Sequence, residues 1–376
     1  MYQLIFFIVF ISFSVVVRAA VFCVSNGTEL LSVIQTASSN GQDDEIRLKN
    51  GDYSHPSQLP FYIDLRDQLE ISGGWRDIGQ LKCGGTTLGS NPMDTTIDGN
   101  DQSPVLFFTY NNSFPEVSVK IRNLTIANGY SSVNGIASGL QMNMPLNHVG
   151  EVVVERVYFI GNHSVHRSAA SISRAANTTI QNSVFQFNNS DNGNGAVYVA
   201  PFVSTTSDAN NFYFINNTLV FNRHKAPSIV NTNSSGLKVL VGGTGNGGAA
   251  PNVFIANNLF WDNDFYDLYI SPNSFAYSYN NNFESFSGAT NFGANSMSEP
   301  PMLAPQLLDF TPQPGSPLIN RGLAAPNSTL NPPPFAENWD YGTVDFDSGL
   351  RVVDGRVDIG AVEALPEVPI FKDGFE

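Results

Sequence analysis

The stretch IANNLFWDND at residues 255–264 contains the pattern that determines the fold of this chain. Asn257 stands three residues before the apolar Phe260, and a second asparagine stands three residues after it. The stretches IQNSVFQFNN at 180–189 and FINNTLVFN at 214–222 repeat this arrangement. A spacing that recurs along a chain indicates a structural repeat, a site, or both.

Further copies of the pattern extend the series to six. They are VKIRNLTIANG at 119–129, VVERVYFIGN at 153–162 and YNNNFES at 279–285. The first positions of the six copies are separated by 33, 26, 34, 41 and 23 residues. Such variable intervals favour stacked coils, because a loop between coils can lengthen without disturbing the strand that stacks. These first positions are Asn123, Arg156, Asn182, Asn216, Asn257 and Asn280.

The repeat predicts an all-β fold, a single-stranded right-handed parallel β-helix. Alternate residues of each short strand point inward, so the middle positions of the six copies are expected to form one internal column. An asparagine at the bend accommodates left-handed backbone and can hydrogen-bond to the asparagine of the next coil. The pattern is therefore interpreted as scaffold. The column consists of Ile126, Phe159, Phe185, Leu219, Phe260 and Phe283.

One segment has helical instead of strand periodicity. GTELLSVIQTASSNG at 27–41 places Leu30, Leu31, Ile34 and Ala37 on one face. Thr28 is expected to cap the start of this helix and Gly41 to end it. An open coil end exposes apolar interior and unpaired strand edges, so we expect the helix to cover the first coil. A C-terminal segment is expected to close the last coil, with VDIGAVE forming one more strand.

The first twenty residues, MYQLIFFIVFISFSVVVRAA, form an apolar run followed by small residues. This pattern is typical of a secretory signal peptide, with Val17 and Ala19 in the small positions and cleavage after Ala19. An uncleaved membrane anchor is the alternative, although the run is short for a membrane span. Cys23 and Cys83 are the only two cysteines. They are expected to form a disulfide in an oxidising compartment.

Four stretches resemble known exported proteins. GTELLSVIQTASSNGQDDEIRLKNGDYS at 27–54 resembles the start of secreted proteins of the pectin-lyase-like superfamily. PQPGSPLINRG at 312–322 and DFDSGLRVVDGRVDIGAVE at 345–363 resemble the ending of bacterial choice-of-anchor Q domain proteins. The final IFKDGFE resembles a tail on exported proteins of some Gram-negative bacteria. The resemblances imply a parallel β-helix that is secreted or displayed on the surface of a Gram-negative cell.

The expected organisation follows from the repeat and from these resemblances. A signal peptide occupies 1–19, an N-terminal cap with a short helix 20–50, and the β-helix 51–300. A choice-of-anchor Q like segment occupies 301–363, and a short tail 364–376. The mature chain is expected to have no membrane span and to be a monomer.

Charge argues against nucleic acid as a partner. The formal net charge is −15 and charged residues make up only 14% of the chain. A nucleic-acid binder needs a basic stripe that releases counterions, and the sequence contains none. The partner expected instead is an extracellular polysaccharide or another surface molecule.

The best chemical candidates follow the second asparagine of two repeats. GNHSVHR at 161–167 and FNRHK at 221–225 place five residues where they could emerge from one edge of the solenoid: His163, His166, Arg167, His224 and Lys225. Such residues suit a polysaccharide lyase, in which a cation neutralises a uronate and a base removes a proton. They also suit simple binding of an acidic glycan. The simpler alternative is favoured: these are a few basic residues on a solvated edge, without a binding or catalytic role.

Trp261 is the candidate for stacking on a sugar. It follows the inward-facing Phe260, so it is expected to face outward. It either contacts a sugar ring or is covered by the segment 286–308, and the second alternative is favoured. The sequence thus favours a protein without catalytic activity that serves adhesion, interaction or surface structure. The alternative is a lyase, hydrolase or binder that acts on acidic polysaccharide such as pectin or alginate.

No cofactor is expected, with calcium as the alternative. DFDSG at 345–349, followed by Asp354 and Asp358, resembles a calcium loop but lacks the full EF-hand spacing. In the choice-of-anchor Q family Asp347 and Arg351 recur together, which implies an internal salt bridge or a turn lock.

Overall fold

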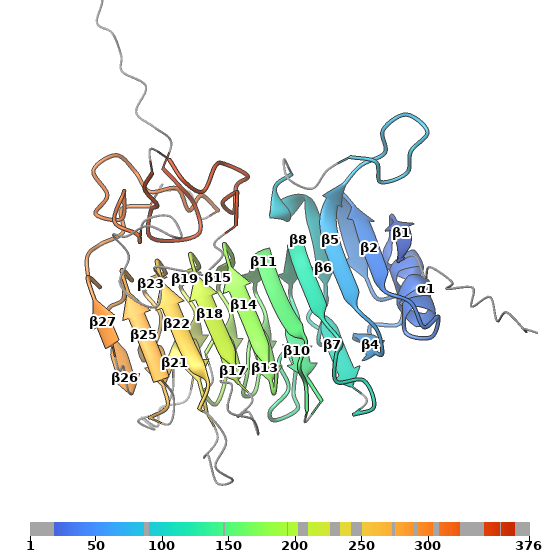
Figure 1. The fold of residues 1–376 in the computed structure, drawn as a ribbon, viewed down its shortest axis with the longest axis horizontal. Helices are drawn as coiled ribbons and strands as arrows, with labels where there is room; N and C mark the ends of the chain where they lie inside the picture. Colours follow the sequence, from blue (N-terminus) through green and yellow to red (C-terminus); the bar gives the residue numbers. More distant parts are fainter. Residues whose placement is uncertain are drawn as a thin grey trace, which may run out of the picture.

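The computed structural model describes residues 19–364, except 86–89, 111, 146, 194, 202–209, 226–233, 242–249, 273–274, 289–291, 304–307, 324–341 and 354. The expected C-terminal tail from 365 onward and nearly all of the expected signal peptide lie outside the described residues. Within them the chain forms a row of stacked coils, with helix α1 at one end (Figure 1). The predicted all-β parallel β-helix is confirmed.

The coils are built from three sheets in which every strand pair is parallel. Sheet B contains β4 (Phe61–Leu65), β7 (Leu106–Tyr110), β10 (Leu140–Asn143), β13 (Ala170–Ser173), β17 (Val197–Ala200), β21 (Ser234–Val239), β24 (Tyr266–Ile270) and β26 (Phe286–Gly288). Sheet C contains four two-residue strands, β9 (Tyr130–Ser131), β12 (His163–Ser164), β16 (Asn189–Ser190) and β20 (Arg223–His224).

Sheet A is the largest, with fifteen strands. They are β1 (Ala20–Val24), β2 (Asp44–Lys49), β3 (Gly51–Ser54), β5 (Leu69–Trp75), β6 (Thr95–Asp98), β8 (Val119–Ala127), β11 (Glu151–Ile160), β14 (Asn177–Gln181), β15 (Val184–Gln186), β18 (Asn211–Ile215), β19 (Thr218–Val220), β22 (Asn252–Ala256), β23 (Leu259–Trp261), β25 (Phe275–Tyr279) and β27 (Phe292–Ala294). In the coils that carry the repeat, the chain bends at the first position of the repeat, and a short stretch of strand lies on either side of the bend.

The predicted internal column is present. Ile126, Phe159, Phe185, Leu219 and Phe260 are paired in register on successive coils and are fully buried. The rings of Phe159 and Phe185 are stacked with centroids 4.6 Å apart. Phe283 is only partly buried but packs against the same core. Each such side chain removes apolar surface from water, which is the main contribution to the stability of the solenoid.

The repeat asparagines were expected to adopt left-handed backbone and to hydrogen-bond to the asparagine of the next coil. Two neighbouring positions of the repeat fulfil these two roles separately. The first positions adopt left-handed backbone, for example φ 55° at Asn216 and φ 59° at Asn257. The predicted amide ladder is made instead by the following residues, where Asn217 donates to Asn258 over 3.1 Å. Asn258 in turn donates to Asn281 over 2.9 Å.

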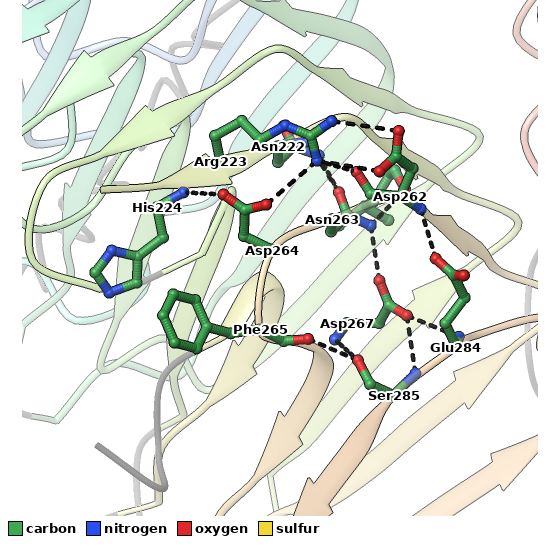
Figure 2. A network of polar contacts seen from close by, with 11 residues as sticks. Asn222, Arg223, His224, Asp262, Asn263, Asp264, Phe265, Asp267, Glu284 and Ser285 are labelled. Atoms are coloured by element: carbon green, nitrogen blue, oxygen red, sulfur yellow. Dashed lines mark hydrogen bonds and ion pairs between the residues drawn. The ribbon is translucent and has the colours of Figure 1, made fainter. Parts of the chain in front are cut away.

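A second amide ladder lies at the bend between sheets A and C. The Nδ2 groups of Asn162, Asn188 and Asn222 each donate to the Oδ1 of the asparagine in the next coil, over 3.0, 3.0 and 2.9 Å. Asn263 ends the series and donates to the buried carboxylate of Asp267 over 2.9 Å (Figure 2). These contacts satisfy amide groups that are otherwise shut off from water.

Helix α1 (Gly27–Ala37) covers the first coil as expected, and Leu30 and Ile34 are buried under it. Its cap differs from the prediction, because Asn26 instead of Thr28 accepts a hydrogen bond from the backbone N–H of Glu29. The helix also ends at Ala37, before Gly41. The predicted disulfide between Cys23 and Cys83 is present and ties β1 to a loop 60 residues away.

The C-terminal segment from 301 onward lies beside the coils, along the second half of sheet A (Figure 1). Phe310 and Phe346 pack against Tyr158 of β11. The prediction of a strand over 357–363 is wrong, because these residues have irregular backbone structure. Their backbone instead binds the scaffold, as when Gly360 donates to the carbonyl of Asn257 over 2.8 Å. No helix in the described part of the chain is long and apolar enough to cross a membrane.

Candidate functional site

Strand register separates the two histidine stretches that the sequence aligned. His163 pairs through β16 with Arg223, whereas His224 pairs through β16 with Ser164. Because side chains alternate along a strand, His163 and His224 point to opposite sides of sheet C. The two rings therefore do not face each other, although both histidines interact electrostatically with Asp191.

His163 and Lys225 lie on the outer side of sheet C, where both contact Asp191. The His163 ring is 3.0 Å from the carboxylate and the Lys225 ammonium is 3.6 Å from it. The hydrogen bond from His163 is the main cause that lowers the pKa of Asp191. All three side chains are substantially exposed, so these ion pairs contribute little to stability.

His224 lies in a polar network at the end of sheet C (Figure 2). Its backbone N–H donates to Asp264 over 3.0 Å, and its ring lies 4.7 Å from the ring of Phe265. The neighbouring Arg223 forms ion pairs with Asp262 and Asp264. Burial is the main cause that lowers the pKa of His224. The polar side chains of this network thus bind one another and hold the last coils together.

His166 and Arg167 belong to a cluster on the outer face of sheet B, and His166 is close enough to His224 for the two to interact electrostatically. The guanidinium of Arg167 lies 3.9 Å from the ring centroid of Tyr198 and donates to Ser171 over 3.1 Å. Lys238, one strand further along, lies 5.5 Å from the ring centroid of Tyr269. Sequence analysis did not find Lys238, because nothing around it repeats.

Trp261 lies on yet another face, under the C-terminal segment. It packs partly buried among Met297, Leu303, Leu318 and Ile359. Met297 and Leu303 belong to the segment that was expected to cover it. Trp261 is therefore part of an apolar contact and not an open sugar platform.

The acidic residues near the C-terminus bind backbone groups. Asp358 accepts hydrogen bonds from Asn320 and Ala364, over 2.6 and 2.7 Å. Arg351, expected beside Asp347, instead lies 3.1 Å from Glu363. Asp354, part of the calcium alternative, lies outside the described residues.

Only one group of potential metal-ligating side chains is close together in the described part of the chain. It consists of Cys23, Asp77 and Cys83. Its two sulfur atoms are joined in the disulfide and are not available as thiolate ligands.

A groove of about 610 Å³ runs across the outer face of sheet A. It crosses β8, β11, β14 and β18, and its lining consists of Lys120, Arg122, Glu151, Val152, Val153, Glu155, Asn177, Thr179, Gln181, Asn211 and Tyr213. Most of these side chains are charged or carry amides. The groove could not be recognised from the sequence, because outward positions of a strand face no packing constraint and show no repeat.

The charges that line the groove are nearly balanced. Arg122 is paired with Glu70 over 2.9 Å, and Glu155 accepts a hydrogen bond from Gln181 over 3.0 Å. Lys120 and Glu151 are both exposed near the starts of the neighbouring parallel strands β8 and β11. The groove therefore offers fixed amide and carboxylate groups without a strong excess of either sign.

An aromatic ladder continues the groove toward the later coils. Tyr213, Phe254 and Tyr277 are paired in register on β18, β22 and β25. Their rings are stacked, with centroids 4.7 and 5.3 Å apart. Leu323 of the C-terminal segment packs against this ladder.

The C-terminal segment also borders the groove itself. A Cβ atom at Gly342 would lie 2.9 Å from Oε1 of Glu155, so the backbone at this residue passes directly beside the groove. Gly342 has φ +78°, a conformation that favours glycine. The segment thus passes close to Glu155 at the side of the groove.

Comparisons of the chain with models of known protein families, with curated proteins and with solved structures found no match.

Proposed function

We propose that this protein is an exported, surface-associated β-helix that binds an extended, hydroxyl-rich polysaccharide without cleaving it. The observation that carries the proposal is the groove of about 610 Å³ across four parallel strands of sheet A. Successive strands lie about 4.8 Å apart, so equivalent side chains recur at a regular interval along the groove. A linear polymer with a repeating unit suits such a surface.

The lining has the chemistry that sugar hydroxyl groups need. Asn177, Gln181 and Asn211 supply amides that both donate and accept hydrogen bonds. Glu155 is held by Gln181 and presents carboxylate oxygens as acceptors. Tyr213 supplies a ring at the end of the groove, where the apolar face of a sugar can pack.

The arrangement of carboxylates supports binding over hydrolysis. Glu151 and Glu155, the two carboxylates among the described lining residues, are four positions apart on β11. At 3.3 Å per residue their Cα atoms lie about 13 Å apart. Glycosidases hold their two carboxyl groups roughly 5 to 10 Å apart across the bond that breaks.

The resemblances of the two ends of the chain support the exported setting. The N-terminal stretch resembles secreted pectin-lyase-like proteins, and the C-terminal stretch resembles choice-of-anchor Q proteins of bacterial surfaces. The disulfide is consistent with an oxidising compartment outside the cytosol. A rigid solenoid with a lateral groove would then hold the polymer at the cell surface.

A binding screen tests the proposal. Purified protein is passed over immobilised cellulose, xylan, mannan, pectin and alginate, and the retained fraction is measured. Unsaturated-uronate absorbance and reducing ends are followed in parallel, with and without calcium. The proposal predicts retention on at least one polymer and no product in either cleavage assay.

Two double variants identify the surface that binds. Lys120→Ala with Glu151→Ala removes two exposed groove side chains and should reduce retention at least fivefold. Lys225→Ala with Asp191→Ala removes an ion pair on sheet C and should leave retention unchanged. Retention on no polymer would overturn the proposal, and release of unsaturated or reducing products that depends on the groove would replace it with an enzymatic function.

A further inference from the structure

The cluster on the outer face of sheet B contains two cations and, among the residues that the structure describes, no acidic partner. It consists of His166, Arg167, Tyr198, Lys238 and Tyr269. We propose that Arg167 and Lys238 together form a binding site for an oxyanion, the carboxylate, sulfate or phosphate group of a ligand. This site lies on a different sheet from the groove and does not depend on the polysaccharide proposal.

Lys238 is the central observation. Its side chain projects from β21 between Tyr198 and Tyr269 of the adjacent strands. Only 8% of the residue is exposed. Within the described residues its ammonium group makes no hydrogen bond and no ion pair, and its nearest specific contact is the Tyr269 ring at 5.5 Å. A lysine is almost never buried to this extent without a partner.

Arg167 brings a second charge to the same place. Its guanidinium lies over Tyr198, one strand from Lys238, and donates to Ser171. Its Nε–H is buried and has no hydrogen-bond acceptor in the part of the chain that the structure describes. The repulsion from Arg167 adds to burial in lowering the pKa of Lys238 to about 8. The two cations thus destabilise each other in the absence of a counterion.

His166 adds a further group without a partner. Its Nδ1 is buried and has no hydrogen bond within the described residues. Burial, followed by Arg167, Lys238 and His224, lowers its pKa and so favours the neutral ring. A neutral imidazole still carries one N–H that can donate to an anion.

An oxyanion explains all three unpaired groups together. It accepts hydrogen bonds from guanidinium, ammonium and imidazole N–H groups, and it neutralises the repulsion between the two cations. Burial makes these charge-assisted contacts stronger than on an exposed surface. The flanking tyrosine rings keep both cations in place through cation–π contacts before a ligand arrives.

Thermal unfolding and titration calorimetry at pH 7 test the site. Purified protein receives sodium glucuronate, sulfate or phosphate, with sodium chloride at equal ionic strength as the reference. We expect a saturable rise in Tm with at least one oxyanion and a matching binding isotherm. A response to glucuronate indicates a sugar acid as ligand, and a response to sulfate or phosphate alone indicates an ester group.

Two variants separate a binding site from a structural contact. Lys238→Met removes the charge and keeps the length, and it should lower oxyanion affinity at least tenfold while raising the Tm of the ligand-free protein. The control Lys225→Met removes an exposed lysine of sheet C and should change neither quantity. The proposal is overturned if no oxyanion acts beyond chloride, if Lys238→Met binds as tightly as the wild type, or if it lowers the Tm of the ligand-free protein.

Discussion

The guanidinium of Arg351 lies 3.1 Å from the carboxylate of Glu363 in the centre of the C-terminal segment, where Arg351 is completely buried. The same guanidinium donates to the carbonyls of Asp358 and Gly360 over 2.9 and 2.8 Å. These contacts organise backbone that belongs to no sheet. The same segment passes close to the groove at Gly342.

Replacing Arg351 with alanine should therefore loosen the segment. Removing one partner of a buried ion pair leaves the other uncompensated and costs about 3–5 kcal/mol. Urea unfolding monitored by tryptophan fluorescence should detect the loss, because Trp261 packs under the segment. Arg356→Ala, which removes an exposed arginine of the same segment, is the control. Equal unfolding midpoints for the two variants would contradict a central role for Arg351.

The amide ladder at the bend between sheets A and C should be sensitive to a single gap. In Asn188→Ala the buried amide of Asn162 loses one of its two acceptors, and the carbonyl of Phe159 loses the hydrogen bond that Asn188 donates. Each buried polar group left unsatisfied costs about 1–3 kcal/mol. Thermal unfolding should show a Tm several degrees lower than that of the exposed control Asn192→Ala. A Tm equal to the control would mean that the ladder is replaceable by water.

Lys238 should give the ligand-free protein a characteristic pH dependence. Lowering its pKa from 10.5 to about 8 corresponds to about 3 kcal/mol of destabilisation. This cost is fully present below pH 8, where both the folded and unfolded states are protonated. Between pH 8 and 10.5 the folded state releases its proton first, so the free energy of unfolding rises with pH. The groups facing Lys238 are Arg167, His166, Tyr198 and Tyr269.

The measurement is the difference in free energy of unfolding between wild type and Lys238→Met, from urea titrations at pH 7 to 10. We expect Lys238→Met to be the more stable protein at pH 7 and its advantage to shrink as the pH rises. An advantage that stays constant across this range would show that Lys238 is not desolvated.

The scaffold was predictable because its determinants are local and repeated. Each bend needs a residue that tolerates left-handed backbone, and each coil needs an apolar residue three positions later. Arg156 shows that the backbone is the stronger constraint, since it adopts φ 52° in place of an asparagine. Its guanidinium is then free to bind the carbonyl of Ser90 over 2.9 Å.

The site was less predictable for two physical reasons. The strands of sheet C are only two residues long. A shift of one position along the strand therefore places the side chain of His163 on the outer side of the sheet and that of His224 on the inner side. The C-terminal segment has no periodic pattern, and its contacts cross long stretches of chain, as from Ser348 to Ser90. Neither relationship can be inferred from spacing alone. The approach of the C-terminal segment to the groove could consequently not be predicted from the sequence.

The most direct test of the polysaccharide proposal uses a series of oligosaccharides of increasing length, prepared from the polymer that retains the protein. Isothermal titration calorimetry would compare wild type with Tyr213→Ala, at the end of the groove, and Tyr62→Ala. Tyr62 is an exposed aromatic on sheet B and serves as the matched control. We predict that affinity rises with oligomer length to a plateau, that Tyr213→Ala loses at least tenfold, about 1.4 kcal/mol, and that Tyr62→Ala binds as the wild type does. Affinity that is independent of length, or an equal loss in both variants, would contradict binding in the sheet A groove.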